Sequence, residues 1–202
     1  MLKKFLLMLM LLCSAGLQAL TLDELQVRFS QMDVVRAGFV QKRQIQDMAQ
    51  PLVSSGRMLM DSQLGLWWQQ EKPFVMTAIL TDQQMVQVTN KQAPQIITVD
   101  SNPQMFQLNL MLRGLFNANR TVLEENFSVN FSDLGGGNWR LNLKPVKAPL
   151  DKLFHQIELQ GSQYLEEIKI FDKQGDLTQI ELTSEAGVQA PLTDEERAYF
   201  VY

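Results

Sequence analysis

Apolar and polar residues alternate along most of the chain after residue 36, with the period of two that is typical of β-strands with one buried face. Phe127, Val129 and Phe131 form one such run, with a polar residue between each pair. Turn residues divide the runs from one another, as in the segments 61–62 and 173–176. We therefore expect about eleven strands, at residues 37–45, 53–60, 64–69, 74–81, 85–88, 95–99, 127–131, 139–143, 157–159, 165–171 and 177–183.

Other segments repeat their apolar residues with the spacing of a helix. Thr21 and Glu24 form a capping box at the start of one predicted helix, which runs through Met32. A second helix is predicted at residues 103–115, and a shorter helical piece at residues 121–126. The strand spacing of about 8–12 residues predicts a single antiparallel meander. No linker divides the chain from residue 20 onward, so we expect one domain.

The first 19 residues have the composition of a secretory signal peptide. Two lysines precede a short apolar run, and small residues lead to Ala19. The apolar run is shorter than the about 20 residues that a membrane-spanning helix needs, which makes a retained anchor the weaker interpretation. Lipid attachment at Cys13 is another alternative, but Leu12 stands where a small residue is expected. We therefore predict that residues 1–19 are a signal peptide and that residues 20–202 form the exported domain.

The composition excludes several classes of function. The 202 residues include one Cys and one His, so a disulfide scaffold and sites that need several of these ligands are excluded. The net charge of −4 becomes −6 when Lys3 and Lys4 leave with the signal peptide, which gives no basic surface for nucleic acid. Residues 135–137, three glycines, lack the following Lys-Ser or Lys-Thr of a phosphate-binding loop and predict a hairpin tip. We expect no metal and no cofactor.

A hydrolytic site in this chain would have to use the only histidine, His155. Asp151, Glu158 and Ser162 are the nearby candidates for its partners. A single histidine between two strands is more often a surface residue than a general base. We therefore expect a protein that is not an enzyme.

Methionine and aromatic residues are frequent on the predicted strands. Met58 and Met60 share one face of their strand, and Met76 lies on the next strand but one. Methionine is flexible and polarizable, and it lines surfaces that accept apolar ligands of varied shape. The same residues could fill an ordinary core, and composition does not separate a filled core from a cavity.

Five short segments follow one another in an order that matches a known family. They are Ala37–Gln41, Ser55–Met58, Leu66–Trp68, Glu71–Pro73 and Thr81–Gln84. In motif and spacing they resemble the periplasmic outer-membrane lipoprotein carriers, the LolA-like family. The predicted helices in the middle of the chain and the C-terminal strands also match in order, so the resemblance covers most of the exported domain.

The resemblance implies a mainly β (α+β) fold, with a curved antiparallel sheet that forms an unclosed barrel and helices that cover its concave face. It implies a periplasmic carrier, a monomer, that holds the acyl chains of a lipoprotein or other lipidated cargo between sheet and helices. The implied partners are an inner-membrane transporter complex and an outer-membrane acceptor. On this basis we expect lipid-binding residues at Phe39, Met58, Met60, Leu66, Trp68, Met76, Leu108, Met111, Leu112 and Leu115.

One departure from the family pattern concerns the lid. Typical members carry Arg-Pro on the strand before the aromatic one, and this Arg tethers the lid helix. Ser62 and Gln63 stand there in this chain, and Arg57 is out of register. The closed state is then held differently or less tightly, and the cargo could be another acylated or polyene lipid. Two other classes stay open: an envelope lipid or glycan hydrolase that uses His155, and a lipid-sensing interaction domain.

Overall fold

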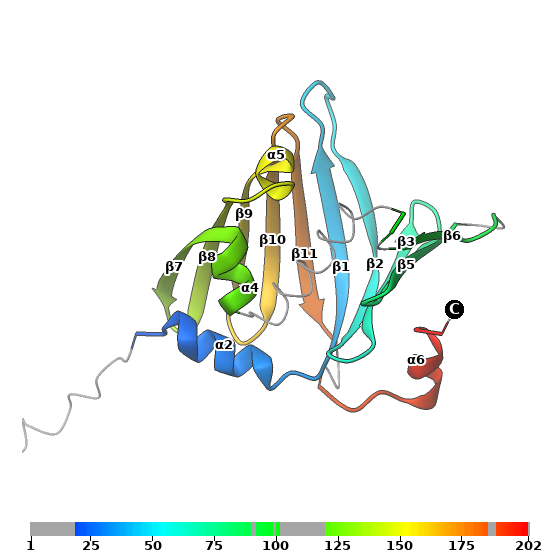
Figure 1. The fold of residues 1–202 in the computed structure, drawn as a ribbon, viewed down its shortest axis with the longest axis horizontal. Coiled ribbons are helices and arrows are strands. Elements are labelled where there is room, and N and C mark those ends of the chain that lie inside the picture. The colour runs from blue at the N-terminus through cyan, green and yellow to red at the C-terminus, as the bar shows by residue number, and fades with distance from the viewer. Residues whose placement is uncertain (1–18, 90–91, 99, 102–119, 186–188, 202) are drawn as a thin grey trace, which may run out of the picture.

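The computed structural model describes residues 19–89, 92–98, 100–101, 120–185 and 189–201. In these ranges the chain forms eleven strands and four helices (Figure 1). The strands are β1 Val34–Gln44, β2 Leu52–Asp61, β3 Gly65–Lys72, β4 Met76–Leu80, β5 Gln84–Thr89, β6 Gln95–Thr98, β7 Phe127–Gly135, β8 Asn138–Pro145, β9 Phe154–Gly161, β10 Leu165–Asp172 and β11 Leu177–Ser184. The helices are α2 Leu22–Ser30, α4 Arg120–Asn126, α5 Leu150–Leu153 and α6 Asp194–Ala198.

All eleven strands belong to one antiparallel sheet, in the order β6-β5-β4-β3-β2-β1-β11-β10-β9-β8-β7. The sheet is curved and does not close into a barrel, because β6 and β7 are its two edges (Figure 1). The predicted mainly β fold with an unclosed barrel is confirmed.

The prediction of a single continuous meander is wrong. Strands β1–β6 form one meander and β7–β11 form a second, and the two are joined by pairing of the first strand with the last, with Phe39 opposite Leu182. Residues 99–126 separate β6 from β7, too many for a hairpin turn. The two strands therefore end as edges, and β1 and β11 meet in the middle of the sheet.

Helices α2, α4 and α5 pack on one face of the sheet, which we call the concave face (Figure 1). Helix α2 begins with the predicted capping box, because Thr21 accepts a hydrogen bond from the Glu24 amide while the Glu24 carboxylate accepts one from the Thr21 amide. Its residues Leu25 and Phe29 are buried, and the Phe29 ring meets Trp139 of β8 edge to face. The helix ends at Ser30, two residues earlier than predicted. The predicted helix at 103–115 lies outside the described residues.

The opposite, convex face carries a second core over β2–β5, and α6 covers it. Trp67 stacks on Tyr199 with ring centroids 4.7 Å apart, and Leu192 is buried beside them. Arg36 of β1 donates to both carboxylate oxygens of Glu196 at 2.6 and 2.7 Å. These hydrogen bonds, more than any other factor, hold the pKa of Glu196 down at about 2. The C-terminal segment is therefore clamped to the convex face by an aromatic stack and an ion pair.

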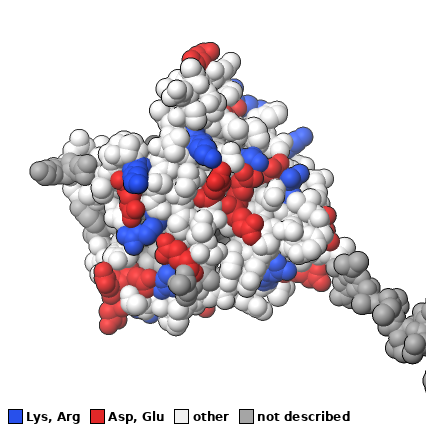
Figure 2. Space-filling view, turned by 180° about the vertical axis from the view of Figure 1, so that it is seen from behind, with Lys and Arg blue, Asp and Glu red and all other residues white. Residues whose placement is uncertain are grey.

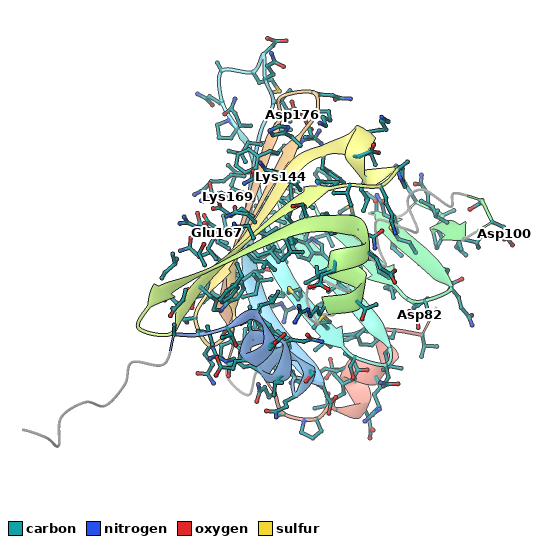
Figure 3. The ribbon with its side chains drawn as sticks, turned by 60° about the vertical axis from the view of Figure 1, so that its left-hand side comes forward. Asp82, Asp100, Lys144, Glu167, Lys169 and Asp176 are labelled. Carbon is teal, nitrogen blue, oxygen red and sulfur yellow. The ribbon has the colours of Figure 1, made fainter. Side chains whose placement is uncertain are left out.

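The rest of the convex face is charged, with both signs mixed. Glu167 and Lys169 of β10 form an ion pair at 2.8 Å on the side of the sheet away from α2 and α4 (Figure 3). Lys42 of β1 pairs with Glu181 of β11 at 3.0 Å in the same way. Figure 2 shows Lys and Arg side chains close to Asp and Glu side chains over the back of the molecule. This surface is a solvated one, with no extended patch of a single charge among the described residues.

Among the described residues, no helix has the length and apolar character needed to cross a bilayer.

Candidate ligand-binding site

The aromatic centre of the concave face is a stacked pair. Phe39 of β1 and Trp68 of β3 lie with ring centroids 3.8 Å apart and an angle of 26° between the rings. Strand β2 lies between β1 and β3 and carries Met58 and Met60. Met58 pairs in register with Trp68 of β3, and Met60 pairs with Leu66. The alternation of a strand places all five residues on the concave face, so the structure brings together five of the ten predicted site residues.

Beside this pair is a cavity of about 270 Å³, partly open to solvent. It lies between the two halves of the sheet, with β3 and β4 on one side and β10 and β11 on the other. The β1–β11 pairing creates this arrangement, because it sets Gln41 opposite Ile180 and brings the C-terminal strands next to the N-terminal ones. The cavity is lined by Gln41, Leu66, Trp68, Ala78, Leu80, Ile168, Ile170, Thr178 and Ile180.

A second hollow of about 290 Å³ adjoins the first and shares Gln41 with it. It is more polar, because Ser54, Gln70 and Arg43 line it together with apolar residues of β2 and the β3–β4 turn. The Arg43 guanidinium donates to Asp176 at 2.9 Å. This hydrogen bond, with a second from the Gln46 backbone amide, lowers the pKa of the Asp176 carboxyl. The concave face therefore carries an apolar cavity next to a more polar hollow, in which Asp176 balances the charge of Arg43.

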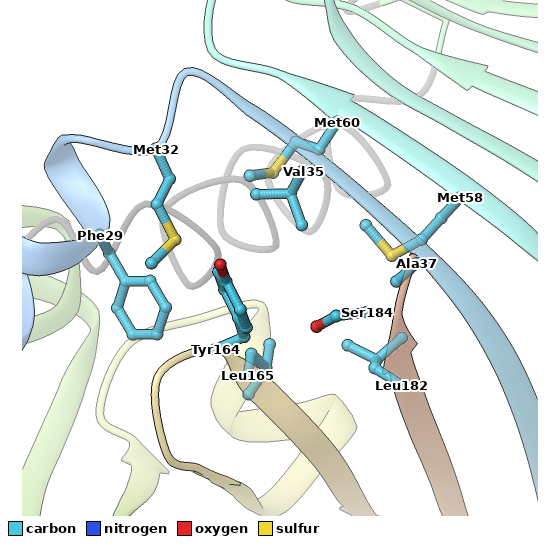
Figure 4. A pocket seen from close by; sticks show the side chains of 10 residues that line it. All are labelled: Phe29, Met32, Val35, Ala37, Met58, Met60, Tyr164, Leu165, Leu182 and Ser184. Atoms are coloured by element: carbon cyan, nitrogen blue, oxygen red, sulfur yellow. The ribbon is translucent and has the colours of Figure 1, made fainter. Parts of the chain in front are cut away.

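A third hollow lies between α2, the start of β1 and the turn after β9 (Figure 4). Met58 and Met60 reach it from β2, and Met32 and Tyr164 lie across from them. Its volume is about 20 Å³, room for about one water molecule. The two methionines are buried and belong to a core cluster with Leu66 and Leu80.

The predicted site residues thus fall into distinct groups. Leu66 and Trp68 line the large cavity, and Phe39 packs behind them against Trp68. Of the three hollows, Met58 and Met60 line the small one. Met76 shares the concave face but lines none of the three, and its sulfur accepts a hydrogen bond from Gln87. Leu108, Met111, Leu112 and Leu115 lie outside the described residues.

Sequence reasoning missed the residues that the C-terminal strands contribute. Ile168 and Ile170 of β10 and Ile180 of β11 form one wall of the large cavity. The sequence predicted strands over residues 165–171 and 177–183, which contain these residues. It did not predict what they face, because that depends on the β1–β11 pairing, which joins strands from opposite ends of the chain. Gln41, noted only as part of a motif, proved to line both hollows.

Among the described residues, His155 forms no hydrogen bond or ion pair with its candidate partners Asp151, Glu158 and Ser162. His155 is exposed on β9. The Ser162 hydroxyl donates to Glu166, and Glu158 lies between Arg140 and Lys169 at 3.7 and 3.8 Å. Within the described ranges, no group of three or more acidic, histidine or cysteine side chains has the arrangement of a metal site.

Ser62, at the place of the family's lid-tethering Arg, lies in the turn between β2 and β3. Its backbone amide donates to the Asp33 carbonyl at 2.8 Å, and its hydroxyl donates to the Asp33 carboxylate at 3.3 Å. The residue therefore fixes the start of β1 to the β2–β3 turn.

The structure is thus a half-barrel, a curved open sheet with an apolar cavity on its helix-covered face. A family described as outer membrane lipoprotein carrier protein LolA-like matches residues 14–200 of the chain. The protein therefore belongs to this LolA-like family, as a divergent member. A comparison with curated proteins finds no significant match.

Solved structures of similar proteins are distant in sequence. A LolA superfamily protein from Nitrosomonas europaea has 9% identity and a TM-score of 0.48, covering 88% of this chain and 97% of that chain. A DUF1329 family protein from Desulfovibrio piger has 13% identity and a TM-score of 0.48, covering 89% and 95%. The MucA/MucB complex of Pseudomonas aeruginosa has 10% identity and a TM-score of 0.43, covering 84% of this chain and 57% of that chain.

Proposed function

We propose that this protein is a periplasmic carrier that holds the acyl chains of a lipoprotein or other lipidated cargo and takes it from the inner to the outer membrane. The observation that carries the proposal is the cavity of about 270 Å³, whose lining is apolar except for Gln41 and Thr178. Joined to the adjoining hollow, it falls within the range of about 300–1,000 Å³ that is usual for small-molecule sites. Binding of a ligand, rather than catalysis, is the activity that this lining supports.

The energetics of an acyl chain explain why such a cavity is needed. Each methylene exposed to water costs about 0.8 kcal/mol, so a 16-carbon chain costs roughly 12 kcal/mol. A lipidated cargo does not cross an aqueous space at a useful rate with that chain exposed. A half-barrel that is not closed can admit and release the chain along its open side, which a sealed barrel could not.

Export of the chain is part of the proposal. We expect cleavage after Ala19, which makes Leu20 the first residue of the exported domain. The Leu20 backbone nitrogen donates to the Asp133 carboxylate at 3.0 Å, and its side chain packs against the main core. A new α-ammonium group at this position would keep the Asp133 contact and add an ion pair to it. The intact mass of protein from the cell envelope tests this: a chain that begins elsewhere contradicts it.

The proposed partners follow from family membership alone. The family is described as outer membrane lipoprotein carriers, and a carrier has to receive its cargo from one partner and hand it to another. We propose that an inner-membrane transporter complex loads this protein and that an outer-membrane acceptor receives its cargo. Cross-linking in intact cells, followed by identification of the captured membrane proteins, tests both partners.

Release of cargo from inner-membrane vesicles tests the carrier activity. The purified protein should move lipidated cargo into the supernatant, and Trp68→Glu should abolish this because it places a charge in the cavity. Ala78→Phe is the second variant, because it fills the cavity without a charge, and Thr77→Phe is its control on the other face of the same strand. Full release by a folded Ala78→Phe protein would show that the cargo binds elsewhere.

A further inference from the structure

We propose that the polar hollow next to the cavity binds the neutral carbonyl linkage, an ester or an amide, that joins the acyl chain to its cargo. Gln41 is the residue that makes this contact. The inference rests on the proposed carrier function, because it assigns the apolar cavity to the tail of the same ligand. It goes further by stating which chemical group of the ligand is recognised and by which side chain.

The position of Gln41 is the first observation. It lies on β1 two residues after Phe39, so both side chains point to the concave face. It pairs in register with Ser54 on one side and with Ile180 on the other. It is shared by the lining of the apolar cavity and of the polar hollow. A group bound to its amide therefore sits where the tail of a ligand leaves the apolar space.

Unused hydrogen-bonding capacity is the second observation. Within the described parts of the chain, the Gln41 amide makes no hydrogen bond to another residue, and the Ser54 and Thr178 hydroxyls make none either. By contrast, the neighbouring Gln70 amide is engaged, because it donates to the Phe74 carbonyl at 3.0 Å. A polar group that is half-buried beside an apolar wall gains most from a partner that arrives with the ligand. The Gln41 amide can donate to a carbonyl oxygen and can also accept from an amide N–H.

The balance of charge is the third observation, and it selects the ligand. Among the described residues that line the two hollows, Arg43 is the only charged one, and Asp176 pairs with it at 2.9 Å. A carboxylate or phosphate bound here would lose its hydration without gaining an unpaired cation. A neutral ester or amide needs only one or two hydrogen bonds, which Gln41 and its neighbours supply. The site therefore favours an esterified or amidated acyl chain over a free fatty acid.

A competition assay with 16-carbon ligands tests this assignment. Methyl palmitate, N-methylpalmitamide, hexadecane, palmitate and hexadecyl phosphate, each delivered from methyl-β-cyclodextrin, would displace a fluorescent alkyl probe from the whole exported chain. We expect the ester and the amide to bind more tightly than hexadecane, palmitate and hexadecyl phosphate. Gln41→Leu should weaken binding of the ester and amide by about two- to tenfold and leave hexadecane unchanged, as expected for the loss of one hydrogen bond.

Gln69→Leu is the matched control, because Gln69 lies on the convex face of β3, where its side chain accepts from Arg57. This variant should keep the preference for ester and amide. If Gln41→Leu keeps the preference too, or if palmitate or hexadecyl phosphate binds more tightly than the ester, the assignment of the polar hollow is overturned while the carrier function stands. If none of the five ligands displaces the probe from the unaltered protein, the carrier function itself fails.

Discussion

The clamp between Arg36 and Glu196 makes a sharp prediction about stability. Both carboxylate oxygens of Glu196 accept from Arg36, and one of them also accepts from the Thr193 backbone amide at 2.8 Å. Arg36 further donates to the carbonyl of Ala190 at 2.7 Å, so it holds the segment that leads into α6. Glu196→Gln keeps the size of the side chain and removes its charge. We expect the C-terminal segment to loosen from the convex face.

The size of the effect follows from the pKa of Glu196, which falls from 4.5 to about 2 because Arg36 donates to the ionised form. At about 1.4 kcal/mol for each pH unit, this difference corresponds to roughly 3 kcal/mol at neutral pH. The Arg36 and Glu196 side chains are 12% and 18% exposed, so water screens part of it. We therefore expect Glu196→Gln to lower the free energy of unfolding by about 1–2 kcal/mol, and the melting temperature by about 3–6 °C.

The dependence on pH gives a second check of the same clamp. A carboxyl whose pKa is lowered in the folded state stabilises the fold fully at a pH above its pKa in the unfolded state, near 4.5. This stabilisation is lost as the pH falls toward the folded-state pKa of about 2. The difference between the unaltered protein and Glu196→Gln should therefore be constant above about pH 5 and shrink below it. Urea unfolding at several pH values measures this difference.

Glu195→Gln is the control, since Glu195 is the adjacent carboxylate and, among the described residues, its side chain accepts a hydrogen bond only from the Tyr199 hydroxyl, at 3.3 Å. It should change the unfolding free energy by less than about 0.5 kcal/mol. Equal stability of Glu196→Gln and the unaltered protein at neutral pH would refute the reasoning, because the clamp would then contribute nothing.

Two further predictions concern the sheet around the cavity. Gly56→Ala should destabilise the fold by about 1–3 kcal/mol or more, because its new methyl would lie 1.9 Å from the Gln69 carbonyl oxygen. Gly38→Ala is the matched control, because no atom lies nearer than 3.9 Å to its new methyl. Equal melting temperatures of the two variants would contradict the close packing of β2 on β3. Phe39→Ala should cost about 3–5 kcal/mol, because it removes a buried ring and the stack on Trp68, and a shift in tryptophan fluorescence should accompany the loss measured by urea unfolding.

Local features of the fold were predictable from sequence, because they depend on neighbouring residues. The capping box at Thr21 and Glu24 and the inward alternation of Leu66 and Trp68 are examples. Helix α6 was missed although Thr193 and Glu196 form the same kind of capping box, because a helix of five residues shows little periodicity.

The candidate site was predictable only in part, because half of it depends on pairing between distant strands. Alternation says which face a residue occupies, and it does not say which strand lies beside it. The wall formed by Ile168 and Ile180 follows from the β1–β11 register, and so does the place of Gln41 between the two hollows. Met58 and Met60 line a separate hollow with room for about one water molecule, and their predicted contact with a lipid stays a prediction.

Pairing of β1 with β11 also has a consequence for how the protein is made. The strand at the middle of the sheet finds its second neighbour only when residues 177–184 have been synthesised. Contacts between the two ends of a chain form slowly, so a newly made polypeptide stays longer without the pairing that joins its two meanders. A chain that ended before residue 177 would lack β11 and therefore part of one wall of the large cavity.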